Sequence, residues 1–261
     1  MKRILNIAFW IFIPIGILIL LGFSNAAQNE LLCAELNVHI DYENGMQFLS
    51  REDVVNRLRQ SNTDPTGKKM LNVQVDEMEA VLMKIPEVQS VEVFKTIDGR
   101  VGVSIAQRRP IVRVINSNGR QFYIDDRGFQ MPVSNYYFPR VPVVHGYISE
   151  PELTESAHEI AGDSLLRSIM RTDDIYAMAN FITGNSFWNA QIQEIYFSRK
   201  GDMELIPIVG DHRIIFGDTS HMEEKFNKLM VFYKEGIKQT GWNRYDTINL
   251  KYRNQIVCSK K

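Results

Sequence analysis

The sequence predicts an α+β protein in which an apolar N-terminal segment precedes two folded regions. Residues 4–23 are almost entirely apolar, and residues 35–109 show strand and helix patterns in the order β-α-α-β-β. Residues 110–261 contain several short alternating segments, which indicate a mostly antiparallel β domain with flanking helices. The chain is 44% hydrophobic and 23% charged, which is typical of a globular protein and not of a disordered one.

Residues 4–23 fit a single transmembrane helix. They carry no charge, and a helix of about twenty residues spans roughly 30 Å, the thickness of the bilayer core. Lys2 and Arg3 precede this segment, and no lysine or arginine follows it until Arg51. The positive-inside bias therefore predicts a cytoplasmic N-terminus at residues 1–3, with the bulk of the chain in the periplasm beyond the inner membrane.

A cleaved signal peptide is the competing interpretation of this segment. Ser24-Asn25-Ala26 has the small-x-small pattern of a cleavage site. However, the apolar run of a signal peptide is about 7–15 residues, which is shorter than the run found here. The length favours an uncleaved anchor, and residues 24–34 then form a short spacer.

The first folded region begins with a strand and a helix. Leu36–Ile40 alternates apolar and polar residues, as a half-buried strand does. Ser50 is expected to cap the helix that follows, with Asp53 as the third residue of a capping box. The buried face of this helix is formed by Val54, Val55 and Leu58.

A second helix and a hairpin complete this region. Asp76 is expected to cap the helix, with Glu79 closing a capping box, and Pro86 ends it. The strand Val88–Ile97 leads into Asp98-Gly99, for which a type I′ turn is expected. The return strand carries alternating apolar residues at Val101, Val103 and Ile105.

These residues carry a family resemblance. The β-α-α-β-β order, with Ile85–Val93 leading into the hairpin, resembles a POTRA domain. The sequence of Gln107–Val112, QRRPIV, resembles the Glu-Arg-x-Pro hinge of the cell-division family FtsQ/DivIB, which joins its POTRA domain to its β domain. Gln107 stands where the family usually has Glu, and the Asp98-Gly99 turn lacks a proline that many members carry.

The second folded region starts with short strands. Val112–Asn116 and Gln121–Asp125 are expected to form a hairpin, followed by a strand at Gln130–Val133. Ile124–Phe129 and Val141–Gly146 are again similar to the β domain of the FtsQ/DivIB family. Residues 149–162 are polar and poorly patterned, and they are expected to form a loop or an irregular helix.

Two amphipathic helices enclose three further strands. Thr172 is expected to cap the first helix, whose buried stripe is Ile175, Met178, Ala179 and Ile182. The second helix begins near Met222 and ends before Gly241. The strands between them are expected at Gln191–Ser198, Met203–Val209 and Arg213–Phe216.

The last segment alternates more regularly than any other. From Thr247 to Cys258 the even positions are apolar except Asn254, which predicts one continuous strand with one face in the core. Ile248–Tyr252 resembles the terminal Asp-Leu-Arg-Tyr stretch of FtsQ/DivIB, with Lys251 in place of Arg. The lysine ammonium cannot form the two parallel hydrogen bonds that an arginine guanidinium makes with a carboxylate. A partner carboxylate would therefore be held less rigidly at this position.

A final strand often lies at the edge of a sheet, where its backbone groups accept a strand from another chain. In the FtsQ/DivIB family this strand is where the small bitopic protein FtsB docks. The resemblance therefore implies FtsB-like and FtsL-like membrane partners. The residues that it assigns to partner binding are Thr247, Ile248, Asn249, Leu250, Lys251, Tyr252, Arg253 and Gln255.

No motif points to catalysis, a cofactor or a metal. His158-Glu159 begins like a zinc-protease motif, but Gly162 stands where the second histidine is required. The pairs Asp125-Asp126 and Asp173-Asp174 fit a turn and the first turn of a helix better than an acid–base pair. The net charge of −1 gives no general affinity for nucleic acid, and Cys33 and Cys258 are compatible with a disulfide or with two free thiols.

The sequence therefore predicts a binding protein and not an enzyme. The family resemblance implies a bitopic scaffold of the divisome that binds FtsB-like and FtsL-like proteins and helps to recruit and regulate septal peptidoglycan synthases. A POTRA-bearing envelope-assembly or transport factor and a cell-wall hydrolase are the alternatives. Against the first alternative, the sequence shows neither the several POTRA repeats nor the membrane β-barrel that such factors normally carry. Against the second, it shows no catalytic motif. The POTRA-like region either docks a partner or acts as a spacer.

Overall fold

The computed structural model describes residue 15 and residues 31–42, 45–134, 136–153 and 156–261. The chain divides between Gln107 and Arg108 into two compact units, and each is described by itself. The expected transmembrane helix at residues 4–23 and the candidate cleavage motif lie, apart from Ile15, outside the described residues. Within the described part of the chain, no helix is both long enough and apolar enough to cross a membrane.

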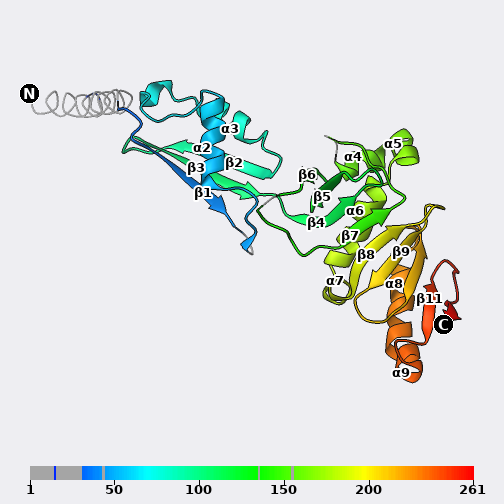
Figure 1. Ribbon diagram of the computed structural model, residues 1–261. Helices are drawn as coiled ribbons and strands as arrows, with labels where there is room; N and C mark the ends of the chain where they lie inside the picture. Colours follow the sequence, from blue (N-terminus) through cyan, green and yellow to red (C-terminus); the bar gives the residue numbers. More distant parts are fainter. Residues whose placement is uncertain (1–14, 16–30, 43–44, 135, 154–155) are drawn as a thin grey trace, which may run out of the picture. The chain divides into compact units, whose positions relative to one another are not determined.

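The N-terminal unit is a three-stranded sheet with two α-helices (Figure 1). The strands follow the order β1-β3-β2, with β1 parallel and β2 antiparallel to the central strand β3. This is the β-α-α-β-β order that the sequence predicts. The elements are β1 (Glu35–Asp41), α2 (Arg51–Gln60), the short 3₁₀ turn η2 (Met70–Asn72), α3 (Val75–Leu82), β2 (Val88–Lys95) and β3 (Arg100–Gln107).

The two helices of this unit start differently from each other. Ser50 caps α2 and forms the expected capping box with Asp53. The expectation for α3 is wrong, because the helix begins at Val75 after Gln74 and Asp76 lies inside its first turn. Glu79 is then too far along the helix to close a capping box. Its carboxylate instead accepts a 2.8 Å hydrogen bond from the backbone N–H of Val93 on β2.

The hairpin between β2 and β3 has a longer loop than the expected type I′ turn. The N–H of Gly99 donates to the carbonyl of Thr96, and the N–H of Thr96 donates to the carbonyl of Arg100. Only Gly99 has a positive φ, of 77°, so the loop has three residues and ends in a glycine bulge. The same bonding pattern recurs at Gly119, Gly128 and Gly201.

The C-terminal unit is built on a nine-stranded mixed sheet in the order β12-β11-β10-β9-β8-β7-β4-β5-β6. Five neighbouring pairs are antiparallel, and the pairs β4–β7, β7–β8 and β10–β11 are parallel. Its strands are β4 (Pro110–Ile115), β5 (Gln121–Asp125), β6 (Gln130–Pro132), β7 (Val143–Gly146), β8 (Ile192–Phe197), β9 (Met203–Pro207), β10 (Arg213–Gly217), β11 (Tyr245–Asn249) and β12 (Val257–Lys260).

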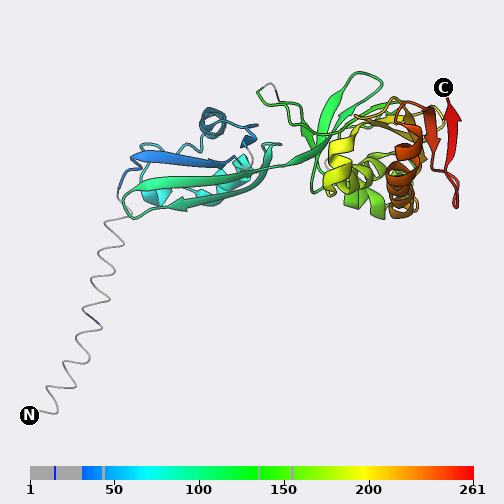
Figure 2. The ribbon, with the colours of Figure 1, turned by 90° about the horizontal axis from the view of Figure 1, so that it is seen from below.

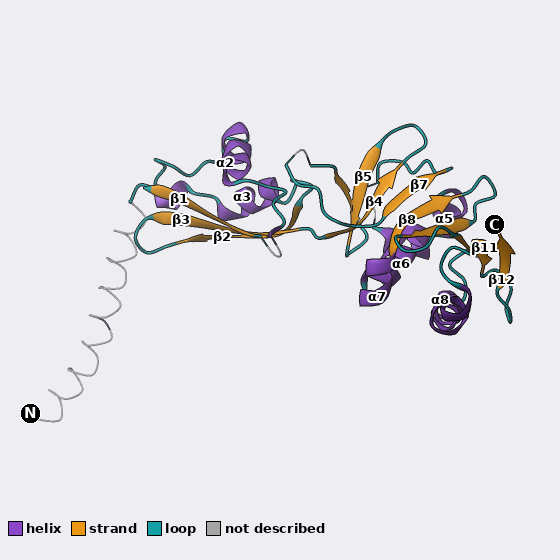
Figure 3. Cartoon of the chain, turned by 60° about the horizontal axis from the view of Figure 1, so that its bottom comes forward, coloured by secondary structure: helices purple, strands orange, loops and turns teal. Residues whose placement is uncertain are grey.

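Three helices cover one face of this sheet (Figure 3). They are α6 (Thr172–Thr183), α7 (Ser186–Gln191) and α8 (Met222–Val231). The expected apolar stripe of α6 is buried in the common core, together with Phe226 and Leu229 of α8. The helix that starts at α8 continues through the π-helical turn η3 (Phe232–Gly236) and α9 (Ile237–Thr240), and it ends before Gly241 as expected.

The remaining helices show where the sequence patterns are weaker. The segment expected to be a loop or an irregular helix contains α4 (Ala157–Gly162), and α5 (Ser164–Ile169) follows it. The six-residue helix α7 is not anticipated by the sequence. Thr172 does not cap α6, because the helix starts at Thr172 after Arg171. The Thr172 hydroxyl instead donates a 2.5 Å hydrogen bond to the buried carboxylate of Glu150.

The expectation of one continuous strand from Thr247 to Cys258 is wrong. The segment forms two antiparallel strands, β11 and β12, which are joined by a turn at residues 252–254. The alternation continues across the turn because Ile248 and Leu250 before it and Ile256 and Cys258 after it all pack against the same core. Figure 2 shows the terminal strand at the end of the sheet.

Candidate partner-binding edge of the C-terminal sheet

One edge of the sheet is formed by β6, and the edge at the C-terminal end of the order is formed by β12 and not by the residues that the sequence assigns to it. β11 lies between β10 and β12, and its partners on the two sides are known residue by residue. Thr247 pairs with Arg213 of β10 on one side and with Ser259 of β12 on the other. The backbone of Thr247 and its neighbours in β11 is therefore used inside the sheet.

The eight sequence-assigned residues divide into two groups. Ile248 and Leu250 are completely buried in the core. Lys251, just before the turn, and Arg253, within it, are exposed, and the Lys251 ammonium lies 2.8 Å from a carboxylate oxygen of Asp202. The structure places Thr247, Ile248 and Asn249 in β11 and Leu250, Lys251, Tyr252, Arg253 and Gln255 in the segment that leads to β12.

Asn254 is the sequence signal that marks the missed edge strand. It is the one polar residue on the apolar side of the alternating segment, and it lies in the turn at residues 252–254. If the first strand ends before Asn254, Val257–Lys260 forms a separate strand, which is β12 in the structure.

The register shows which backbone groups of β12 face outward. Leu250 donates its N–H to the carbonyl of Ile215 on β10. Because the backbone groups of successive residues in a strand point to opposite sides, the N–H and C=O groups of Thr247 and Asn249 face β12. Their partners Ser259 and Val257 are therefore the hydrogen-bonded residues of β12. Cys258 lies between them, so its N–H and C=O face away from the sheet, where another strand can pair with them.

The hairpin is held in place from both ends. The ammonium of Lys228 on α8 donates to the carbonyls of Tyr252 at 2.7 Å and Arg253 at 3.1 Å, which fixes the turn. At the other end, the ammonium of Lys261 forms an ion pair with Asp211, and the Thr247 and Ser259 hydroxyls are hydrogen-bonded across the strands. The edge is therefore preorganised, which lowers the entropic cost of adding a strand.

A buried histidine lies at the base of this hairpin. His212 is 4% exposed, and its Nε2 lies 2.9 Å from the hydroxyl of Tyr233 on η3. Burial lowers the pKa of His212 below 6.5, and a backbone group of Trp242 and the charge of Asp211 offset this shift only in part, while Lys261 adds to it. Burial also raises the pKa of Tyr233, so the phenol stays neutral.

This histidine predicts a pH-dependent stability. Because the folded state holds the pKa of His212 below its unfolded value of about 6.5, stability is complete above that value and falls as the pH decreases below it. We expect the denaturant midpoint of the C-terminal unit to decrease between pH 7.5 and 5.5, and His212→Asn to reduce this dependence. Equal pH dependence in the two proteins would show that His212 is not responsible.

The acidic pairs and the zinc-protease-like motif have structural roles. Asp125 is fully buried and binds Arg108 at 2.7 Å, and Asp174 accepts a hydrogen bond from Thr219. Glu159 forms a capping box with Ser156 at the start of α4. Across the described residues, no group of three or more His, Cys, Asp or Glu side chains could hold a metal ion.

Cys33 and Cys258 are both free thiols that belong to different units. Cys33 is buried in the core of the N-terminal unit, and this burial raises its pKa. Burial likewise raises the pKa of Cys258. Neither thiol therefore has the lowered pKa of a reactive cysteine.

Comparisons with known proteins agree with this architecture. Residues 109–259 match the family model described as FtsQ/DivIB, C-terminal related, and residues 31–106 match a POTRA-like domain. A cell division protein FtsQ of Rhodothermus marinus is 22% identical over 180 residues, which cover 67% of this chain and 62% of that protein. A cell division protein FtsQ of a Geobacter species is 24% identical over 219 residues, covering 82% of this chain and 73% of that protein.

The matched part thus spans less than two thirds of the length of the Rhodothermus relative. Both relatives are named for cell division, and neither name describes a catalytic activity.

Proposed function

Because the chain belongs to the FtsQ/DivIB, C-terminal related family, we propose that it acts in cell division as a scaffold that binds membrane partners by strand addition at β12. The protein is a member of a family of cell-division proteins and is not an enzyme. The partners in this proposal are FtsB-like and FtsL-like bitopic proteins. Through them the chain helps to recruit and regulate septal peptidoglycan synthases.

The observation that carries this proposal is the outward-facing backbone of β12. The strand is only four residues long and pairs with β11 along one side. Lys260 is the last residue of the strand and Lys261 follows it, and charged residues of this kind hinder indiscriminate pairing of an exposed edge. An edge that is short, charged and preorganised favours a specific strand over aggregation.

The topology in this proposal follows from the N-terminal sequence. An uncleaved anchor at residues 4–23 would hold the chain in the inner membrane, with its two units in the periplasm at the division septum. Confinement to the membrane raises the effective concentration of membrane-bound partners, so a modest strand-pairing affinity is sufficient. The POTRA-like unit would dock a further division protein, or would set the distance of β12 from the membrane.

The test removes one outward-facing donor and leaves the sheet intact. Cys258→Pro deletes an N–H that the sheet does not use, whereas Cys258→Ala truncates the same side chain and keeps the N–H. We expect the proline variant to bind the FtsB-like protein of the same organism about tenfold more weakly, because it loses a backbone hydrogen bond and crowds the incoming strand. The alanine variant keeps its affinity. Binding is measured with the purified full chain.

A second proline variant calibrates this comparison. Val257→Pro removes an N–H that pairs with Asn249 inside the sheet, so it should lower the melting temperature more than Cys258→Pro does. If Cys258→Pro remains folded and binds the partner as tightly as Cys258→Ala does, strand addition at β12 is excluded.

A further inference from the structure

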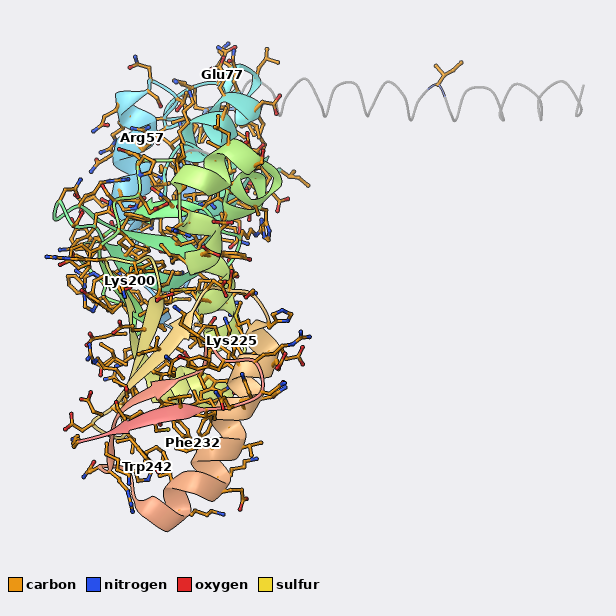
Figure 4. The ribbon with its side chains drawn as sticks, turned by 90° about the vertical axis from the view of Figure 1, so that its right-hand side faces the viewer. Arg57, Glu77, Lys200, Lys225, Phe232 and Trp242 are labelled. Carbon is orange, nitrogen blue, oxygen red and sulfur yellow. The ribbon has the colours of Figure 1, made fainter. Side chains whose placement is uncertain are left out.

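An open groove of about 790 Å³ lies directly next to the edge strand. One wall is the face of α8 and η3 from Glu223 to Gly236, and the other wall is the segment Asn254–Ile256 that leads into β12. Figure 4 labels Phe232 on this helix, beside the strands of the terminal hairpin. The helical wall covers thirteen residue steps and is therefore about 20 Å long.

The helical wall presents a continuous stripe of side chains. The groove-lining positions recur at spacings of three and four residues, namely Glu224, Asn227, Lys228, Val231, Phe232, Glu235 and Gly236. This spacing is the face that one helix offers to another. Val231 lies at the centre of this stripe and is 61% exposed, and Phe232 beside it is half-buried.

Gly236 shapes the apolar part of this stripe. A Cβ atom added at Gly236 would lie 2.9 Å from the ring of Phe232, so the glycine lets the ring lie close to the backbone of η3. Ile256 contributes the apolar surface of the opposite wall, where it is half-buried and packs against the core. The centre of the groove is therefore apolar along both walls.

The charges around this apolar centre are unbalanced. Glu223, Glu224 and Glu235 are exposed, and within the described part of the chain they form no ion pair. Lys228 is the one basic residue that lines the groove among the described residues, and its ammonium is bonded to the carbonyls of the hairpin turn. The helix dipole stabilises the negative charges of Glu223 and Glu224, which lie in the first turn of α8. Glu235 lies too far from the N-terminus of the helix for this effect.

We propose that this groove binds a basic amphipathic helix of the same partner that adds a strand to β12. Apolar side chains of that helix contact Val231, Phe232 and Ile256, and flanking Lys or Arg side chains pair with the three glutamates. The inference rests on the proposed function, because it takes the groove and the edge strand β12 as one continuous binding surface. A strand added outside β12 extends the sheet to the open side of the groove. The helix covers the apolar face that this added strand would otherwise expose.

The groove is tested separately from the edge strand by two synthetic helical peptides. Both peptides carry leucines at positions i, i+3, i+4 and i+7, and one has lysines and the other glutamates on the flanking positions. Binding to the full-length chain is measured by fluorescence anisotropy of the labelled peptides. We expect the lysine peptide to bind at least tenfold more tightly in low salt, with the difference decreasing as salt increases.

Three variants assign this preference to the groove. Glu224→Gln combined with Glu235→Gln should weaken binding of the lysine peptide at least fivefold, and it should not weaken the glutamate peptide, because it removes like-charge repulsion. Val231→Ser should weaken both peptides, because it removes apolar contact. Glu92→Gln changes an exposed carboxylate on β2 of the other unit and should change neither affinity.

Several results would overturn the proposal. Equal affinity of the two peptides, no binding of either, or unchanged binding after the double glutamine substitution would each exclude a basic helix. A dimer of the full chain that dissociates on Val231→Ser would assign the groove to a second copy instead. Cys258→Pro should not alter peptide binding, so failure at the edge strand and failure at the groove are distinguishable.

Discussion

Replacing Asp125 with alanine is expected to lower the stability of the C-terminal unit by about 3–5 kcal/mol. The carboxylate is completely buried, and one of its oxygens lies 2.7 Å from the Arg108 guanidinium. The other oxygen accepts hydrogen bonds from the backbone N–H groups of Arg127 at 3.0 Å and Phe129 at 2.7 Å. Alanine would leave two N–H groups and a largely buried guanidinium without their acceptor.

The adjacent residue provides a matched control. Asp126 also binds an arginine, at 3.2 Å from Arg109, but the two side chains are 27% and 50% exposed. Exposed ion pairs contribute about 0–1 kcal/mol, so Asp126→Ala should cost far less than Asp125→Ala. Denaturant unfolding followed by tryptophan fluorescence measures both, because Trp188 and Trp242 lie in this unit. Equal losses in the two variants would show that the buried network is not the cause.

This pair of aspartates shows how far sequence patterns reach. The sequence correctly places Asp125-Asp126 in a turn, because the turn is encoded locally by residues 125–129. It does not distinguish the two carboxylates, since burial depends on which face of the sheet each side chain occupies and on the distant Arg108. The same separation of local from distant information applies to the helices. The stripe of α6 is predicted, but the role of Thr172 depends on Glu150.

The candidate site follows the same rule. The alternation from Thr247 to Cys258 correctly indicates extended structure, because both strands direct apolar side chains to one core. The alternation alone does not reveal the turn, because residues 252–254 contain neither glycine nor proline and Asn254 is their one typical turn residue. The edge position of β12 depends on parallel pairing of β11 with β10, which joins segments more than thirty residues apart in the chain. No local pattern encodes such a pairing.

The largest loss from a single core side chain is expected for Phe226→Ala, at about 3–5 kcal/mol. Phe226 on α8 is 1% exposed, and its ring stacks on Phe181 with centroids 4.5 Å apart. The rings of Phe216 and Trp188 each lie 4.9 Å away. Aromatic pairs of this geometry contribute about 0.5–1.5 kcal/mol beyond their buried area, so the cost should fall in the upper part of the range for core truncations.

The measurement is a thermal melt of the full chain followed by tryptophan fluorescence, with an expected decrease in melting temperature of about 10 °C. Phe232→Ala is the matched control, because this half-buried phenylalanine of the adjoining helical turn lines the groove. It should cost less stability and yet weaken the lysine peptide. Phe226→Ala should cost more stability and yet leave binding of the lysine peptide unchanged at temperatures where the unit remains folded. The reason is that its ring packs on the opposite side of the helix from the groove. A loss below about 1 kcal/mol for Phe226→Ala would contradict the packing of α8 against the sheet.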